Sequence, residues 1–413
     1  MRLNNFIASE SKQIRESFIG EDSNLPALTE LSKTDSNPKK VNSILITHIL
    51  HTAVEYVRTL NNIYPVKGIV AVPYSADLNA VEQLKKEGFN IIVPDSVSDT
   101  FTKSEEMALD YLNNNKEPLV IQEVGGYLAK STNKLSEFEQ FIGIVEDTNN
   151  GHWRYEQTAP HNCPILSMAQ SPLKFVEDTI IGDAIIYSVE RVIREDYSAI
   201  LQGMRAGVIG FGKIGRSSAV ALKGRESVVS IYDINPSKNM SAKVEGFYPF
   251  PLNQLLTQSD LIVGCTGQTS IRLVDMPYIK EGAILASGSS KNIEFDLDGF
   301  ATKCRVEKIN EVITRYTRNA DNKSFYILNN GTPINFRDKS ILGTILDMIY
   351  CELFVCLREV VNGKVKKGLH KSEEYIQNEV SKAWLRAHSP TFSDAPEDKV
   401  WDYPESLKLG LPK

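Results

Sequence analysis

Three glycines near the middle of the chain have the spacing of a phosphate-binding loop. They are Gly210, Gly212 and Gly215, and they lie between an expected strand and an expected helix. The first glycine permits a tight turn, the second lets the backbone approach a pyrophosphate, and the third lets helix and strand pack closely. The phosphates would lie at the positive end of the helix. We therefore expect this loop, with its other residues Lys213 and Ile214, to bind a dinucleotide.

An aspartate supports this interpretation. Asp233 ends the next expected strand, about 20 residues beyond the loop, where an acid can hydrogen-bond a ribose hydroxyl. An acid at this place favours NAD over NADP, because it would repel a 2′-phosphate. A second loop, with Thr266 and Gly267, follows another expected strand and would approach the same cofactor, although an ordinary turn is the alternative. The residues therefore predict NAD as the cofactor.

Lys174 and Asp178 are candidates for proton transfer. They are four residues apart on a long helix expected over 172–194, so they face the same way. A carboxylate beside an amine in a desolvated site can take a hydroxyl proton while a hydride leaves. From spacing alone, a surface ion pair is the commoner outcome.

Strands and helices alternate on both sides of this helix. Before it we expect strands at 44–47, 68–72, 90–93 and 118–122, and after it strands at 206–210, 228–232, 261–264 and 283–286. Such alternation predicts parallel sheets with right-handed crossovers. A length of 413 residues favours two domains. We expect an α/β fold in which a Rossmann NAD-binding domain, 181–340, is inserted in a second α/β domain with a parallel sheet, 1–180 and 341–413.

Composition excludes several classes of protein. A formal net charge of −6 argues against a nucleic-acid partner, because there is no basic excess to replace phosphate counterions. The most apolar stretch, 341–361, is interrupted by Asp347, Glu352 and Arg358, so it predicts a buried amphipathic helix rather than a membrane span. Five scattered cysteines fit no disulfide framework and no zinc site, so we expect reduced core thiols, no metal and a cytoplasmic protein.

The order of the motifs resembles that of the S-adenosyl-L-homocysteine hydrolase family. In chain order the matching segments are 143–151, the helix with Lys174 and Asp178, the glycine loop, Asp233-Ile-Asn-Pro236, Cys265-Thr-Gly267 and Asn329-Asn-Gly331. The resemblance is strongest from Gly143 to Asp296. In that family, bound NAD oxidises the ribose 3′-hydroxyl, the 5′ thiol is eliminated, water adds, and the hydride returns.

The resemblance assigns roles to individual residues. It implies that Lys174 and Asp178 manage the hydroxyl proton and that Glu146 or Asp147 binds the sugar. His48 lies in the segment that matches the family's substrate segment. The residues matched to cofactor contacts are Thr148, Asn149, Asn150, Thr266, Gly267 and Asn329.

The substrate side departs from the family's pattern. Val124 holds the position of a catalytic aspartate, and the adjacent Glu123 could stand in for it. Ser290 holds the position of the family's histidine, and a hydroxyl there could bind a ligand. The family's Gly-His-Pro segment is replaced around Asn335–Arg337. The cofactor half of the family's site therefore persists, whereas the substrate half is changed.

The leading hypothesis is an enzyme of this family that oxidises a hydroxyl on a nucleoside or related ribosyl compound with tightly bound NAD. The alternatives are S-adenosyl-L-homocysteine hydrolysis with relocated acids, a regulatory protein that holds NAD without turnover, and a dehydrogenase that releases NADH. The expected partners are a nucleoside-like small molecule and further copies of the chain, since we expect a homo-oligomer.

Overall fold

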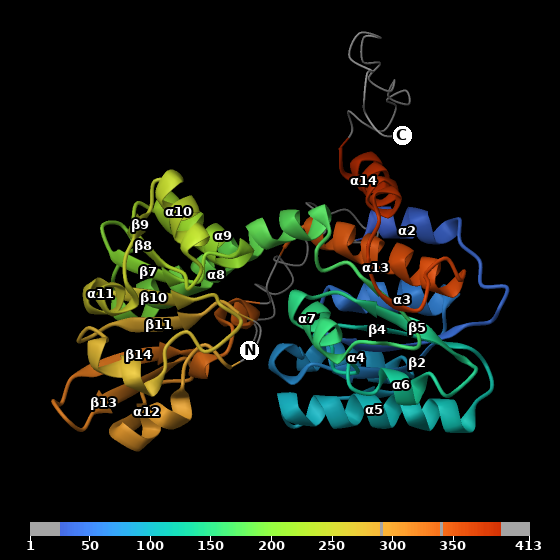
Figure 1. Ribbon diagram of the computed structural model, residues 1–413, viewed down its shortest axis with the longest axis horizontal. Coiled ribbons are helices and arrows are strands. Elements are labelled where there is room, and N and C mark those ends of the chain that lie inside the picture. The colour runs from blue at the N-terminus through green and yellow to red at the C-terminus, as the bar shows by residue number, and fades with distance from the viewer. Residues whose placement is uncertain (1–24, 290–291, 339–341, 390–413) are drawn as a thin grey trace, which may run out of the picture.

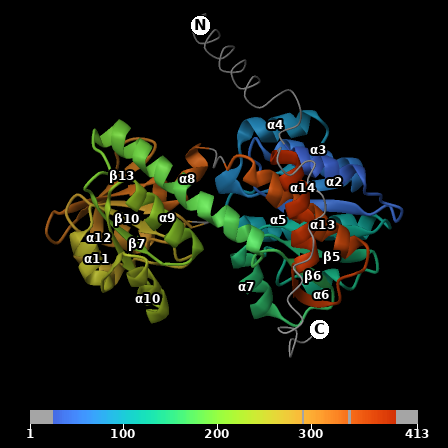
Figure 2. The ribbon, with the colours of Figure 1, turned by 90° about the horizontal axis from the view of Figure 1, so that it is seen from above.

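Two α/β domains, joined by one long helix, make up the described structure. The structure is a computed structural model, and it describes residues 25–289, 292–338 and 342–389. Helix α8 (Pro172–Tyr197) crosses from one domain to the other in both views (Figures 1 and 2). The chain returns through η3 (Asn329–Gly331) and η4 (Ile334–Asp338). The expected two-domain α/β fold is confirmed.

The N-terminal domain is built on a parallel sheet with the described strand order β15-β6-β5-β4-β1-β2-β3. The strands are β1 (Asn42–Thr47), β2 (Val66–Ala71), β3 (Ile91–Ile92), β4 (Leu119–Glu123), β5 (Phe141–Glu146), β6 (Pro164–Ser167) and β15 (Gly368–Lys371). The four strands expected here from the sequence, β1 to β4, are present. The sequence did not predict β5, β6 or β15, which complete the sheet toward the C-terminal helices.

Helices cover both faces of this sheet. They are α2 (Pro26–Lys33), α3 (Ala53–Ile63), η1 (Pro73–Ser75), α4 (Leu78–Lys86), α5 (Val97–Asn114), α6 (Thr132–Leu135), α7 (Asn149–Thr158), α13 (Ile345–Val361) and α14 (Glu374–His388). Helix α13 is buried on nearly every side, where the sequence predicted an amphipathic helix. Its Asp347 carboxylate is buried. The cost of this burial is offset because the carboxylate accepts hydrogen bonds from the amides of Ala27 (2.9 Å) and Leu28 (3.0 Å) at the start of α2.

The central domain has a mixed sheet with the described order β12-β13-β14-β11-β10-β7-β8-β9. Its strands are β7 (Arg205–Ile209), β8 (Val228–Tyr232), β9 (Tyr248–Pro249), β10 (Leu261–Gly264), β11 (Ile284–Ser287), β12 (Cys304–Lys308), β13 (Ile313–Arg318) and β14 (Ser324–Leu328). Its helices are α9 (Lys213–Gly224), α10 (Pro236–Val244), α11 (Leu252–Gln258), η2 (Leu273–Tyr278) and α12 (Leu297–Lys303). The parallel strands β7, β8, β10 and β11 match the expected ones, whereas β13, antiparallel to both neighbours, was not predicted.

Helix α8 packs closely on α9. It begins with Pro172, as the sequence predicted, and ends three residues later than expected; Ser171 caps its first turn. A side-chain carbon on Gly182 would overlap Ser217 and lie 2.5 Å from the Ser218 nitrogen. The two helix backbones can approach this closely only because residue 182 is a glycine.

Two further expectations concern the compartment and the membrane. All five cysteines are buried free thiols, as predicted. Among the described helices, none combines the length with the apolar composition that a bilayer crossing needs.

Candidate active site

The predicted functional residues gather where the two domains meet. The residues after β5 approach the loop after β10, and those after β1 approach η4; the carboxyl ends of parallel strands are where such folds bind ligands. The rings of His48 and Phe336, from different domains, lie 5.3 Å apart between centroids. A side-chain carbon on Gly267 would lie 3.5 Å from Asn150 Oδ1. The two domains therefore form this site jointly.

The glycine loop has the geometry that a dinucleotide requires. Gly210 has φ +93°, and a side-chain carbon there would lie 2.7 Å from the carbonyl oxygen of Cys265. A side-chain carbon on Gly215 would overlap the Gly210 carbonyl oxygen, so both positions need glycine. At Gly212, by contrast, a side chain would meet nothing within 4 Å, so the space at the start of α9 is open to a pyrophosphate. The loop fits the diphosphate of NAD.

Asp233 lies beside the same loop, immediately after β8. Its Oδ2 accepts a hydrogen bond from the Phe211 amide at 2.6 Å, and its Oδ1 accepts one from the Asn235 amide at 2.8 Å. These bonds fix the carboxylate next to the phosphate loop. This is the place from which it can reach the ribose of a bound dinucleotide.

A buried glutamate that the sequence analysis missed holds the second loop. Glu294 is fully buried, and it accepts hydrogen bonds from the amides of Thr266 (2.7 Å) and Gly267 (2.8 Å) and from the Thr266 hydroxyl (2.9 Å). Burial raises the pKa of Glu294, while these donors act in the opposite direction. Because Glu294 lies 28 residues beyond Thr266, no local spacing pattern indicated the contact.

Glu146, expected to bind a sugar, instead holds a loop of the N-terminal domain. Its fully buried carboxylate accepts hydrogen bonds from the amides of Gly125 (3.0 Å), Gly126 (2.9 Å) and Thr148 (2.6 Å) and from the Thr148 hydroxyl (2.7 Å). A side-chain carbon on Gly151 would overlap it. Glu146 therefore positions the loop, and the acid that faces the other site residues is its neighbour, Asp147.

The residues after Asp147 open helix α7. The Thr148 hydroxyl accepts a hydrogen bond from the Gly151 amide at 3.1 Å and so caps the helix. Asn149 and Asn150 form its first turn, and Asn150 lies beside Gly267 of the central domain, as described above. The predicted cofactor contacts of this segment are thus placed at the domain junction.

Glu123, expected as a stand-in catalytic acid, points into the core. It is fully buried, accepts hydrogen bonds from the Tyr155 hydroxyl and from the Leu128 amide (3.2 Å), and pairs in register with Glu146 on β5. Burial raises the pKa of Glu123, and the nearby Glu146 raises it further. Its bonds serve the turn after β4, so the structure gives no support to a role in substrate chemistry.

Lys174 is the central cation of the junction, but its partner is not the expected one. Its buried Nζ lies 3.0 Å from Asp147 Oδ1 and contacts the carboxylate of Glu177. Asp178 instead pairs with Lys213 of the glycine loop, with 3.2 Å between Oδ2 and Nζ. Glu177 was not predicted as a site residue, although it is three residues from Lys174 and therefore also lies on its face.

The charges of this group shift the pKa values of its members. Burial alone would lower the pKa of Lys174, but Asp147, Glu177 and Asp178 raise it above its ordinary value, so Lys174 is an ammonium. Burial raises the pKa of Glu177 to about 7, against the opposing effect of Lys174. Burial also raises the pKa of Asp178, which Lys174 and Lys213 oppose.

The other predicted residues lie at the edges of this group. His48 follows β1, its Nδ1 is 2.5 Å from the Ser75 hydroxyl, and burial lowers its pKa to about 4. The rings of Tyr74 and Phe336 flank it. Asn329 lies in η3, where the chain leaves the central domain. Ser290 lies outside the described residues.

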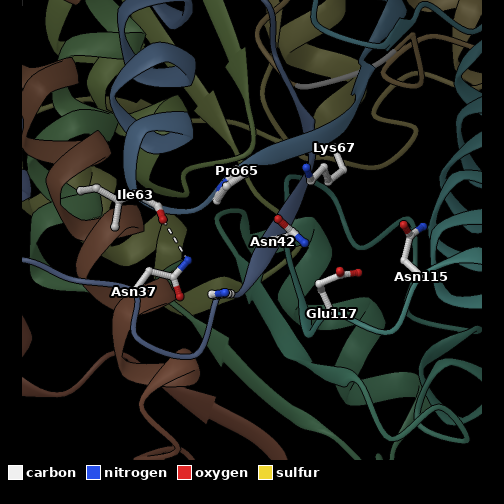
Figure 3. A pocket seen from close by; sticks show the side chains of 8 residues that line it. Asn37, Asn42, Ile63, Pro65, Lys67, Asn115 and Glu117 are labelled. Carbon is white, nitrogen blue, oxygen red and sulfur yellow. Dashed lines mark hydrogen bonds between the residues drawn. The ribbon is translucent and has the colours of Figure 1, made fainter.

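A cavity at the opposite end of the N-terminal sheet is lined by none of the predicted functional residues. It has a volume of about 440 Å³ and lies at the amino ends of β1, β2 and β4 (Figure 3). The amide of Asn37 is already bonded to the carbonyl oxygens of Val41 and Ile63, and that of Asn42 to the Tyr111 hydroxyl. We therefore place the candidate active site at the domain junction.

Comparisons with known proteins find relatives of the NAD-binding domain and of the chain over most of its length. Residues 183–340 match a family model described as the NAD-binding domain of S-adenosyl-L-homocysteine hydrolase. The chain is 24% identical to an adenosylhomocysteinase of Saccharolobus solfataricus, over 98% of each chain. It is 22% identical to the adenosylhomocysteinase of Sulfolobus acidocaldarius, over 92% of each. It is 24% identical to an S-inosyl-L-homocysteine hydrolase of Methanosarcina mazei, over 60% of this chain and 61% of that one.

The match to the NAD-binding domain covers the glycine loop, Asp233 and the loop that Glu294 holds. The comparisons with full-length relatives extend over both domains. The chain is therefore identified as a divergent, NAD-dependent enzyme that resembles the S-adenosyl-L-homocysteine hydrolase family, and its residues 183–340 match the NAD-binding domain of that family.

Proposed function

We propose that the protein oxidises a ribose-type hydroxyl of a nucleoside or related small molecule while NAD stays bound. NAD, when bound, supplies the hydride acceptor. The chain must then hold the sugar at the domain junction and accept the hydroxyl proton. Lys174, which contacts Asp147 and Glu177, is the group placed for this task once its ammonium has given up a proton.

The position of Lys174 relative to the glycine loop carries the proposal. On α8, Asp178 is one helical turn from Lys174, and it pairs with Lys213 at the start of α9. The proton-handling group is thereby linked to the loop that fits the diphosphate. We propose that the glycine loop, Asp233 and Thr266–Gly267 contact the cofactor, with further contacts from Thr148, Asn149, Asn150 and Asn329.

Addition of adenosine to purified protein with retained NAD tests the oxidation. We expect an absorbance increase from reduced nicotinamide within one turnover. Lys174→Met should abolish the increase while NAD content stays unchanged. Lys223→Met, on an exposed part of α9, is the matched control and should react normally. No absorbance change with any nucleoside would contradict the proposal, and continuous NADH release would indicate a dehydrogenase instead.

A second candidate is complete thioether hydrolysis, as in relatives named adenosylhomocysteinase. It is favoured by the 98% coverage of such a relative. It is weakened by Glu123, which points into the core and so does not replace the family's aspartate at the site. Release of thiol from S-adenosylhomocysteine by the purified protein would establish it. Oxidation without thiol release would leave the first proposal alone.

We also propose a homo-oligomer that packs through helix α8. Its outer face exposes Phe175, Val176, Ile180 and Tyr187, with exposed fractions between 37% and 54%. The spacing of Val176, Ile180 and Tyr187 places these three along one stripe, with Phe175 to one side of it, and a second copy of the chain offers the same stripe for an isologous contact. Ile180→Asp should lower the mass measured by light scattering, whereas Val244→Asp on α10 should not. An unchanged mass for Ile180→Asp would contradict this interface.

Cytoplasmic location is a further proposal, supported by the five buried free thiols, which suit a reducing compartment. Cell fractionation with an antibody to the chain tests it.

A further inference from the structure

The acids around Lys174 differ in the cation that each one contacts. Glu177 and Asp178 are adjacent on α8, and both are buried. Glu177 contacts the Lys174 ammonium directly. Asp178 is turned toward Lys213, a residue of the central domain. The carboxylate that shares a contact with Lys174 on its own helix is therefore Glu177.

Water is largely kept from this contact. The side chains of Lys174 and Glu177 are 9% and 8% exposed. Few solvent molecules can therefore exchange protons with either group, and the shortest path for a proton from the ammonium leads to an adjacent carboxylate. Asp147, on the other side of Lys174, is the competing acceptor at 3.0 Å, and its side chain is 13% exposed.

We propose that Glu177 exchanges a proton with Lys174 during the oxidation and is thus a positioning residue that acts through this lysine. This inference rests on the function proposed above. The ammonium of Lys174 gives one proton to the Glu177 carboxylate, which leaves a neutral amine and a carboxylic acid. The amine then takes the hydroxyl proton of the substrate as the hydride leaves. The substrate has lost one proton and one hydride, Lys174 is an ammonium again, and Glu177 holds the proton.

The charged groups that face Glu177 set its pKa. They are Lys174 and Asp178 on α8, Asp147 after β5, Tyr350 on α13 and, through Asp178, Lys213 on α9. Burial raises the pKa of Glu177 to about 7, Lys174 opposes this, and Asp147 adds to it. A carboxyl group in this range can both accept and return a proton at physiological pH.

Three variants of the NAD-loaded full chain test the role of Glu177. Glu177→Gln keeps the shape and removes the ionisation, Glu177→Asp keeps the ionisation, and Glu190→Gln is the control. Glu190 lies on the same helix but pairs with Arg194 and Arg225, away from Lys174. Circular dichroism and NAD content should be equal in all of them, which excludes a folding defect.

Two measurements give independent readouts. In an infrared titration with carboxyl-labelled glutamate, we expect the signal that titrates near pH 7 to lose one carboxyl group in Glu177→Gln, while the contributions of Glu146 and Glu352 remain. In single-turnover reduction of bound NAD by adenosine, Glu177→Gln should be slower by on the order of a hundredfold and lose the inflection near pH 7. Glu177→Asp should recover part of the rate and the inflection, and Glu190→Gln should match the wild type.

The outcomes separate this inference from the proposed function. A Glu177→Gln variant that keeps both the wild-type rate and its pH inflection overturns the inference alone. The same holds if Asp147→Asn, and not Glu177→Gln, removes the inflection, or if no Glu177 carboxyl titrates between pH 6 and 8. A wild type that reduces no NAD with any nucleoside overturns the proposed function, and the role of Glu177 in it.

Discussion

Two buried glutamates do the same structural work in the two domains. Glu146 holds the loop after β4 in the N-terminal domain, and Glu294 holds the loop after β10 in the central domain. Each accepts hydrogen bonds from backbone amides and from a threonine hydroxyl, and each is fully buried. Both loops border the candidate active site, one from each side.

The two glutamates differ in their neighbours. Glu146 lies in register with Glu123, so the N-terminal domain buries two carboxyl groups on adjacent strands. The groups that act on Glu294 are hydroxyls and two backbone amides, from Ser289, Ser270, Thr266 and Gly267. A pair of buried acids titrates as a unit, whereas a single acid among donors keeps its charge more easily. The substrate-side loop is therefore the one whose support depends on pH.

Removal of the Glu146 carboxylate should have the largest effect. Glu146→Ala leaves three amides and one hydroxyl without their acceptor, with an expected loss on the order of 4 kcal/mol in the free energy of unfolding. Glu294→Ala leaves two amides and one hydroxyl, with a loss on the order of 3 kcal/mol. Urea unfolding measures both. Losses below about 1 kcal/mol would mean that water replaces either carboxylate without difficulty.

The pH dependence of stability should come mainly from the N-terminal domain. Burial raises the pKa of Glu146 from 4.5 to about 7. Below the lower value both states are protonated, and between the two only the folded state keeps the proton, so stability falls as pH rises through this window. The loss amounts to about 3 kcal/mol at most. Thermal unfolding between pH 5 and 8 should show it, and Glu123→Gln should flatten the curve. A curve that rises with pH would contradict the assignment.

Glycine replacements should separate the two sides of the site. Gly215→Ala should weaken NAD binding roughly tenfold to a hundredfold, because the added carbon overlaps the Gly210 carbonyl oxygen and costs about 1–3 kcal/mol. Gly126→Ala, whose added carbon would lie 2.8 Å from the Gly151 Cα, should weaken NAD binding less than Gly215→Ala does but should impair nucleoside oxidation. Calorimetric titration with NAD measures the first effect. Equal NAD affinity in the two variants would contradict the expectation that Gly215 serves the cofactor more directly than Gly126 does.

The smallest effect is expected at Asp233. Asp233→Asn removes the negative charge beside the glycine loop but keeps its shape, with an expected loss of about 1 kcal/mol in NAD binding. The discrimination against NADP should fall, because the repulsion of a 2′-phosphate is gone. Competition between the two cofactors measures this. An unchanged preference for NAD would show that the backbone, rather than Asp233, excludes the phosphate.

The sequence predicted those parts of the fold in which local pattern and function coincide. The glycine loop has a fixed spacing because a strand, a turn and a helix must meet around a phosphate, so Gly210, Gly212 and Gly215 could be identified directly. Helix α8 was predicted because Pro172 opens it and apolar residues follow. Strand β5 was missed although it is as long as β1, because Gly143 interrupts its apolar run, and β6 was missed because it begins at Pro164.

The partners of charged residues could not be predicted in the same way. A spacing of four residues places Asp178 on the face of Lys174, but a spacing of three does the same for Glu177. The choice between them depends on Lys213, which comes from another element and attracts Asp178. In the same way, Glu146 and Glu294 hold backbone amides of loops that lie 20 to 28 residues away. Long-range contacts of this kind have no periodicity in the sequence.

The close packing at Gly182 sets the distance between Lys174 and the glycine loop. Lys174 lies two turns before Gly182 on α8, and the glycine loop opens the helix on which Gly182 rests. The thickness of a single methyl group at residue 182 would lift α8 from α9 and carry Lys174 away from Lys213 and the loop. The position of Lys174 relative to the glycine loop thus depends on Gly182, a residue that takes no part in the chemistry.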